Sequence, residues 1–143
     1  MERGTVLYYA GDYAAALEAL RAYMDDAPSI KLPDTHYYSG LCYSKQGAWQ
    51  RAFAEFDTVI ERYPDHALVP DAWAAKARAE EASGGDPSGI YLEFAVRYPS
   101  NTRAAEFVWL AAQALEGAGN WSEAARLYRR LRSDYPTSTR NRR

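Results

Sequence analysis

The sequence predicts an all-α solenoid built from about four stacked pairs of antiparallel helices, the first of them truncated and the third degenerate. Three observations support this prediction. Eight positions recur along the chain at identical intervals of 3, 4, 2, 3, 4, 3 and 5 residues. In each full copy a glycine separates two stretches with helical periodicity, and a proline ends the copy. Units that repeat at a fixed period of this length bury their apolar faces against neighbouring units, which is the arrangement of a solenoid.

Three copies keep the full pattern. Their positions are Gly4, Leu7, Gly11, Tyr13, Ala16, Leu20, Tyr23 and Pro28 in the first, Gly40, Tyr43, Gly47, Trp49, Ala52, Phe56, Val59 and Pro64 in the second, and Ala112, Leu115, Gly119, Trp121, Ala124, Tyr128, Leu131 and Pro136 in the last. We place the repeats at about 1–28, 34–64, 70–99 and 102–136, in a single domain (1–143) that ends in a tail at 137–143.

Each interval has a local physical reason. Steps of three and four residues put side chains on one face of an α-helix, which predicts one helix through Gly40 and Tyr43 and a second through Ala52 and Phe56. The glycine between the helices can take the left-handed conformation that ends a helix. We expect this conformation at Gly11, Gly47 and Gly119.

The remaining recurring positions predict N-caps, helix crossings and helix ends. Asp12 and Asn120 follow their glycines as N-caps of the next helix. Small side chains should lie where the two helices of a pair approach most closely, at Ala16, Ala52 and Ala124. The closing proline disfavours helical geometry at the residue before it, so the second helices should end at Tyr63, Tyr98 and Tyr135.

The third copy departs from this pattern. Its turn is made by residues 84–87, and Gly85 lies 14 residues before the closing proline, whereas the corresponding distance is 17 in the other copies. With Asp86 as the cap and a proline next, its second helix should be about one turn shorter. We still expect Tyr91 and Phe94 to reach the core. The shortening is either a deletion absorbed by packing or a local change of curvature that shapes the groove.

The pattern resembles the tetratricopeptide repeat over nearly the whole chain. This resemblance implies a right-handed superhelix whose first helices line a concave groove for a protein or peptide. Two stretches, YPDHALVPDAWAAKA and YPSNTRAAEFVWLAA, are also similar to repeats of bacterial cell-envelope proteins. Those proteins are the barrel-assembly lipoprotein, the Tol-Pal-associated periplasmic coordinator and the helical region of soluble lytic transglycosylases. The resemblance therefore implies a non-catalytic scaffold for protein or peptide binding in a bacterial envelope assembly.

Within this resemblance, the side chains around the small packing residue of each first helix are candidates for the partner groove. They are Tyr8, Tyr9, Tyr37, Leu41, Lys45, Trp109, Gln113 and Glu116. Arg78 and Glu81 join them if the third copy keeps its register. Aromatic side chains are effective anchors because they bury a large area while losing few torsions, although some of these rings could instead pack between helices.

The residue types do not favour catalysis, and we expect no cofactor and no metal ion. A nucleophilic triad needs a hydroxyl or thiol beside a base, and His36 and His66 are expected at the surface or as caps. Cys42 with two separate histidines does not make a usual zinc site, and its thiol should pack as a small apolar group. The Glu-Ser motif of a lytic transglycosylase is absent. One alternative is therefore that the chain is the non-catalytic helical segment of such an enzyme, which acts on peptidoglycan through a catalytic domain encoded elsewhere.

Charge is unevenly distributed, although the formal net charge is only −2. Residues 1–35 carry six acidic and three basic side chains, whereas residues 120–143 carry seven arginines and two acidic side chains. The basic cluster does not favour nucleic acid, because the pI is near 5.7 and a broad basic face with interleaved aromatics is missing. A second alternative is a solenoid that self-assembles head to tail, basic end against acidic end.

The compartment is left open by the sequence. No stretch approaches the roughly 20 apolar residues of a membrane span, so we expect no membrane insertion. Residues 1–10 show no leader pattern, the first copy is short and the tail has no apolar face. We expect a piece of a longer protein or a short protein that completes itself by association. The periplasm or cell envelope is favoured for a longer exported protein, and the cytoplasm otherwise.

Overall fold

The computed structural model describes residues 2–26 and 32–136, and the all-α prediction is confirmed for them. They form eight helices and no strand. The helices are α1 (Glu2–Tyr9), α2 (Tyr13–Asp26), α3 (Leu32–Lys45), α4 (Trp49–Arg62), α5 (Val69–Ala82), α6 (Ser88–Arg97), α7 (Ala104–Gly117) and α8 (Trp121–Asp134). Within this part of the chain, no helix is both long and apolar enough to cross a membrane. Pro28 and the tail at 137–143 lie outside the described residues.

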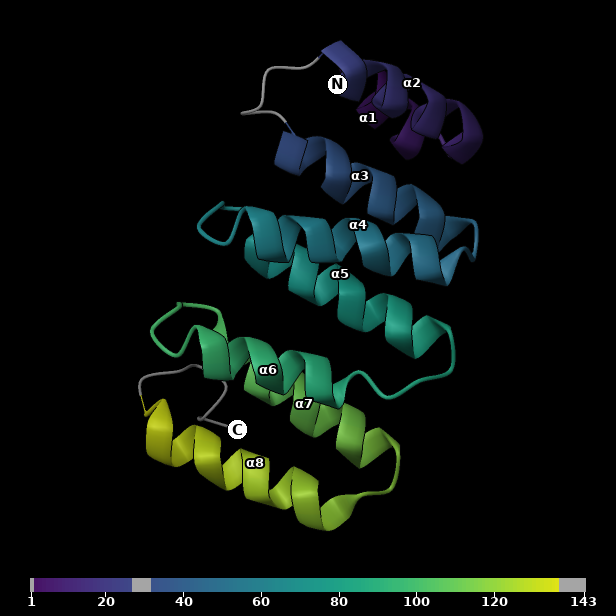
Figure 1. The fold of residues 1–143 in the computed structure, drawn as a ribbon. Helices are drawn as coiled ribbons and strands as arrows, with labels where there is room; N and C mark the ends of the chain where they lie inside the picture. The colour runs from purple at the N-terminus through teal and green to yellow at the C-terminus, as the bar shows by residue number, and fades with distance from the viewer. Residues whose placement is uncertain (1, 27–31, 137–143) are drawn as a thin grey trace. The chain divides into compact units, whose positions relative to one another are not determined.

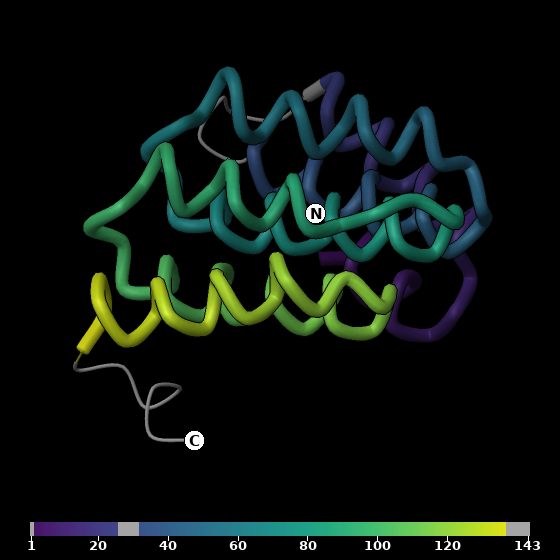
Figure 2. The backbone as a smooth tube through the Cα atoms, turned by 90° about the horizontal axis from the view of Figure 1, so that it is seen from below, coloured from purple at the N-terminus to yellow at the C-terminus, as the bar shows by residue number. Residues whose placement is uncertain are grey.

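The helices belong to two compact units, Met1–Ser83 and Gly84–Arg143. In the first unit each helix from α1 to α5 packs against the next, and α3 also contacts α1 and α5 (Figure 1). The first helices of successive pairs therefore lie side by side. In the second unit α7 packs against both α6 and α8, and the chain reverses direction between α7 and α8 (Figure 2). The superhelical path over all four repeats stays a prediction, as does the single domain.

The predicted glycine turns are confirmed. Gly11, Gly47 and Gly119 have φ angles of 86°, 72° and 82°, and Gly84 in the degenerate copy has 97°. This region of backbone conformation is open to glycine at little cost but strained for residues with a Cβ. Each of these residues therefore ends a first helix and lets the chain turn back.

Of the two predicted N-caps, one is confirmed. The Asp12 carboxylate accepts a hydrogen bond from the backbone N–H of Ala15 at 3.2 Å. Asn120 occupies the N-cap position of α8, but its side chain makes no capping hydrogen bond, so that part of the prediction is wrong. The backbone adopts this turn without a side-chain cap. Ala48 before α4 has nearly the same φ and ψ angles as Asn120, although it has no polar side chain.

The predicted ends of the second helices are also confirmed. The three tyrosines that precede a proline are the C-caps, with φ between −132° and −127° and ψ between 54° and 60°. Each tyrosine N–H still donates to a carbonyl of the last turn, and its ψ, which is positive and not helical, then leads the chain out of the helix. These C-caps are Tyr63, Tyr98 and Tyr135.

The two helices of a pair approach very closely at the predicted crossings. The three alanines at the crossings are buried; they are Ala16, Ala52 and Ala124. On the opposite helix, a Cβ added to Gly40 would lie 2.5 Å from a ring carbon of Phe56, and one added to Gly4 would lie 2.7 Å from Leu20. Glycine at these two positions makes room for a large apolar side chain of the partner helix.

The third copy is shortened as predicted. Helix α6 has 10 residues, whereas α2, α4 and α8 have 14 each. Asp86, the predicted cap, lies one residue before the N-cap Pro87, so this assignment is wrong by one residue, and its carboxylate accepts a hydrogen bond from the Ser88 N–H at 2.9 Å. Tyr91 and Phe94 are buried, and their rings pack against Phe107 of α7 at centroid distances of 5.7 and 4.1 Å. The effect of this shortening on the curvature stays a prediction.

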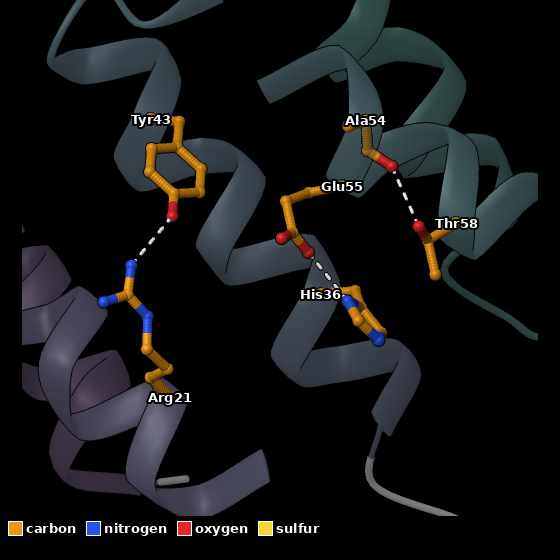
Figure 3. Close-up of polar contacts among 6 residues, drawn as sticks. All are labelled: Arg21, His36, Tyr43, Ala54, Glu55 and Thr58. Atoms are coloured by element: carbon orange, nitrogen blue, oxygen red, sulfur yellow. Dashed lines mark hydrogen bonds and ion pairs between the residues drawn. The ribbon is translucent and has the colours of Figure 1, made fainter. Parts of the chain in front are cut away.

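Polar contacts tie neighbouring helices of the first unit together (Figure 3). Arg21 of α2 donates to the Tyr43 hydroxyl of α3 at 3.2 Å, and His36 Nδ1 of α3 lies 2.7 Å from Glu55 Oε2 of α4. The other histidine, His66, accepts a hydrogen bond from the Leu68 N–H at 3.1 Å in the loop before α5. His36 therefore links α3 to α4, and His66 stabilises the loop before α5.

Candidate functional site

The first helices of the pairs in the first unit line a cavity with a volume of about 370 Å³. Helices α1, α3 and α5 supply all of its lining residues except Trp49, which begins α4. The lining residues are Tyr8, Leu41, Ser44, Lys45, Trp49, Ala75, Arg78, Ala79 and Ala82. On α3 the lining residues lie three and four positions after Leu41, and on α5 they lie three, four and seven positions after Ala75, so each helix presents one stripe of side chains to the cavity.

One part of the cavity surface is apolar and backed by the core. Ala75 and Ala79 of α5 are buried in a cluster with Ala52 and Phe56 of α4, and Leu41 and Trp49 pack against the same cluster. Small side chains on α5 leave the space of the cavity open, while the aromatic ring of Trp49 provides contact area. This surface is rigid because the residues behind it are closely packed.

The other part of the cavity is cationic. Lys45 and Arg78 are exposed, and neither forms an ion pair with any residue in 2–26 or 32–136. By contrast, Lys76, two residues before Arg78, pairs with Asp57 at 2.7 Å. None of the lining residues carries a carboxylate. Lys45 and Arg78 are therefore free to bind an anionic group.

The positive charge of Arg78 affects the pKa of two tyrosines on the neighbouring helices. Burial raises the pKa of Tyr8, with smaller contributions from Tyr13, Tyr9 and Cys42, and the Arg78 guanidinium opposes this rise. Burial also raises the pKa of Tyr37, helped by Asp71 and again opposed by Arg78. Both phenols remain protonated at neutral pH and can donate hydrogen bonds.

Two other groups of α3, the Ser44 hydroxyl and the Cys42 thiol, are buried. The Ser44 hydroxyl oxygen is buried and has no hydrogen-bond partner among the described residues. Cys42 is fully buried against Ala16 and Leu20, and burial raises the pKa of its thiol to about 11. The thiol therefore stays protonated at neutral pH and packs as the sequence predicts.

The structure brings together three of the residues predicted for the groove, namely Tyr8, Leu41 and Lys45. Tyr9 is 71% exposed, and its hydroxyl lies 3.5 Å from the Tyr38 hydroxyl, outside the cavity lining. The Tyr37 ring is partly buried and packs 6.2 Å from the Phe56 ring, measured between centroids. Tyr37 thus contributes to packing between α3 and α4.

The other three predicted residues lie on α7 in the second unit. Trp109 is half-buried, and Gln113 and Glu116 are exposed. The Glu116 carboxylate accepts a hydrogen bond from the Tyr128 hydroxyl of α8 at 2.9 Å. That these residues bind a partner, together with those of the first unit, stays a prediction.

Several lining residues were not among the predicted ones. Ser44 lies three residues after Leu41, so the helical spacing could have found it. Trp49 was interpreted only as one of the eight recurring positions of the repeat, and Ala75, Ala79 and Ala82 carry no signal beyond their small size. Arg78 was expected only if the third copy kept its register, and it lines the cavity.

Comparison with known families decides the identity of the repeats. Two segments of the chain match the tetratricopeptide repeat, one over residues 1–67 and the other over residues 107–138. The chain belongs to the tetratricopeptide repeat family. Together the two matches cover about two thirds of the residues. No curated protein matches the chain. Tetratricopeptide repeats are generally non-catalytic and mediate contacts between proteins, so the cavity on α1, α3 and α5 is the candidate site of such a contact.

Proposed function

We propose that the chain is a non-catalytic tetratricopeptide scaffold that binds a protein or peptide segment in the cavity formed by α1, α3 and α5. The observation that carries the proposal is the cavity itself, which combines a rigid apolar surface with two unpaired cationic side chains. Pockets that bind ligands are mostly apolar, with a few convergent polar groups that orient the bound molecule. We propose the predicted residues on α7 as a separate contact in the second unit.

The proposal predicts that changes inside the cavity remove partner binding without unfolding the protein. Affinity capture would compare the wild-type protein with a Tyr8→Ala/Lys45→Glu variant, in which both changed side chains line the cavity. We expect proteins captured by the wild type to be reduced tenfold or more with this variant, because an aromatic contact and a favourable charge are both lost.

The matched control is Arg62→Glu, a charge reversal at an exposed position near the end of α4 and outside the cavity lining. It should capture the same proteins as the wild type, and circular dichroism should show equal helix content for all three proteins. Equal capture by the cavity variant would place the binding surface elsewhere and contradict the proposal.

We further propose a bacterial envelope assembly as the setting of this scaffold. The support is the similarity of the stretches that begin at Tyr63 and Tyr98 to repeats of envelope proteins. Performing the capture separately with periplasmic and cytosolic fractions tests the setting, since a partner found only in the cytosolic fraction would contradict it. The helical segment of a lytic transglycosylase remains the enzyme-linked alternative. A neighbouring coding sequence with a Glu-Ser catalytic domain would favour that alternative.

Exposed apolar side chains on the first and the last helix favour self-assembly as a second candidate function. On α1, Val6 and Tyr9 are 66% and 71% exposed. On α8, Trp121 is 65% exposed, and Arg129 and Arg132 on the same stripe form no ion pair within the described part of the chain. Residues 1–35 carry an excess of acidic side chains, so the apolar side chains of α1 and the basic, aromatic stripe of α8 can form a heterologous contact between copies.

Head-to-tail assembly predicts concentration-dependent oligomers that weaken as salt screens the charges. Sedimentation velocity at low and high salt would measure this, with Trp121→Ser expected to shift the distribution toward the monomer. The arginines at positions 140, 142 and 143 lie outside the described residues and would add to the same charge. A monomer at every concentration and salt level would exclude self-assembly.

A further inference from the structure

One exposed face of α8 corresponds to a face that is covered on α4. Both are second helices of their repeats, and each α8 residue corresponds to the α4 residue 72 positions earlier, as Trp121 corresponds to Trp49. On α4, Trp49 and Phe53 are partly buried and pack against the cluster that α4 shares with α5. The next first helix, α5, therefore covers this face of α4.

A polar contact also joins each second helix of the first unit to the first helix that follows it. Asp57 of α4 pairs with Lys76 of α5 at 2.7 Å. At the corresponding place on α2, Arg21 donates to the Tyr43 hydroxyl of α3 at 3.2 Å. The same position therefore contacts the next first helix at the α2–α3 and the α4–α5 junctions. On α8 this position is Arg129.

On α8 the corresponding side chains are exposed. Trp121 is 65% exposed, whereas Trp49 is partly buried. Arg132 is exposed, whereas its counterpart Ile60 is only 4% exposed. A helix that packed here would bury the indole ring and the aliphatic stems of the arginines. We call this surface the α8 face, and it consists of Trp121, Ala125, Arg129 and Arg132.

The charge of the α8 face indicates which kind of helix fits it. Helix α4 presents the carboxylate of Asp57 and the apolar side chain of Ile60 at the positions where α8 presents two guanidinium groups, those of Arg129 and Arg132. A helix that packs on α8 as α5 packs on α4 therefore needs a carboxylate where α5 has Lys76. Hydrogen bonds between guanidinium and carboxylate groups are stronger than those between neutral groups.

Small side chains next to this charge allow a close approach of the two helices. Ala75 and Ala79 of α5 are buried in the cluster shared with α4, and Lys76 directly follows the first of them. The corresponding pattern for α8 is a small residue, then Asp or Glu, and a second small residue four positions after the first.

A second copy of this chain does not bring this pattern to the α8 face. Lys76 lies eight residues before Gly84, the turn glycine of its repeat. In α1 the residue eight positions before the turn glycine Gly11 is Arg3. A copy that docked through α1 would therefore place Arg3 opposite Arg129, and like charges at a contact are unfavourable. The correspondence between repeats favours a different chain as the occupant.

We infer that the α8 face binds an acidic amphipathic helix of another protein, in which an Asp or Glu directly follows the first of two small residues four positions apart. Arg129 binds the carboxylate, which exchanges the charges of the Asp57–Lys76 pair. Arg132 adds a second positive charge, and Trp121 packs against the apolar side of the helix. The site lies on α8 and is separate from the cavity on α1, α3 and α5.

The test uses peptides derived from α5 together with the full chain. The parent is acetyl-VPDAWAAKARAEEA-amide. Its Lys76→Glu version carries the inferred pattern, whereas its Arg78→Glu version has the same net charge but keeps the lysine. Nuclear magnetic resonance titration of the isotope-labelled protein detects the weak binding of short helices, using the Trp121 indole N–H and the Arg129 Nε–H. We expect the Lys76→Glu peptide to shift these signals and to bind at least tenfold more tightly than the Arg78→Glu peptide.

A charge exchange in the protein tests the contact itself. Arg129→Asp gives α8 the carboxylate that α4 has at this place, so it should reverse the preference and bind the Arg78→Glu peptide more tightly. Arg126→Asp is the matched control, because Arg126 is exposed on α8 outside the α8 face and corresponds to the exposed Ala54 of α4. This control should keep the preference of the wild type, and circular dichroism should show equal helix content for the three proteins.

The remaining outcomes overturn the inference. Equal binding of the two peptides, or an equal change of preference in both variants, would show attraction by the charge of the whole surface. The absence of any shift at Trp121 and Arg129 would show that the α8 face binds no such helix. Oligomers in sedimentation velocity that the Lys76→Glu peptide dissociates would show a second copy as the occupant. None of these results affects the proposed function, which has its own test in the capture experiment with the cavity variant.

Discussion

Replacing Phe56 with alanine should lower the free energy of unfolding by about 3–5 kcal/mol. The Phe56 side chain is fully buried at the centre of a cluster that joins α3, α4 and α5. The Phe56 ring occupies the volume in which a Cβ at position 40 would lie. Gly40 therefore has no side chain that could fill the space left when the ring is removed. A cavity would therefore remain, and its cost adds to the lost transfer free energy of the ring. Urea unfolding followed by circular dichroism measures the change.

Phe53→Ala is the matched control for this prediction. Phe53 lies one turn earlier on α4, is only partly buried and packs at the margin of the same cluster. Its truncation should cost clearly less than that of Phe56, because the exposed part of the ring gains nothing from folding. Equal losses for the two variants, or a loss below about 1 kcal/mol for Phe56→Ala, would show that Phe56 is not the centre of the packing.

Replacing Ala52 with leucine should lower the free energy of unfolding by about 1–3 kcal/mol, for the opposite physical reason. Ala52 is fully buried where α4 crosses its neighbours, and it contacts the cluster that contains Ala75 and Ala79 of α5. The added isopropyl group has no free space there, so it must push the helices apart or take a strained rotamer. The same urea unfolding experiment applies.

Ala54→Leu provides the control for overpacking. Ala54 is two residues further along α4 and exposed, so a larger side chain meets water there and the stability should change by less than about 0.5 kcal/mol. A tolerated leucine at position 52 would contradict the close helix crossing on which the assignment of every repeat depends.

The local features of the repeats could be predicted from the sequence because each depends on residues close together in the chain. A glycine at the end of a first helix is free to adopt a positive φ, and proline disfavours helical geometry at the tyrosine before it, as Gly47 and Tyr63 show. The third copy has fewer residues between its turn and Tyr98, and this local difference shortens α6 by one turn. Asn120 was the exception, because the backbone turn supplies its own hydrogen bonds and does not need the amide side chain.

The candidate site could be predicted only in part. Tyr8, Leu41 and Lys45 were found because the repeat pattern places them on the first helices, and these helices line the cavity. Tyr37 belongs to the same pattern, yet its ring packs against Phe56, since the direction of a large ring depends on the space that neighbouring helices leave. Trp49 was not predicted to line the cavity because it lies in a second helix, and its position at the start of α4 brings it there.

The sequence by itself determined the helix pairs, their turns and their ends, and with these the membership in the tetratricopeptide repeat family. Its signals act over a few residues, through backbone conformation and helical periodicity. Only the tertiary structure showed that Lys45 and Arg78, 33 positions apart in the chain, line one cavity without an acidic partner. That arrangement depends on how α1, α3 and α5 pack side by side, and packing between distant segments leaves no local pattern in the sequence.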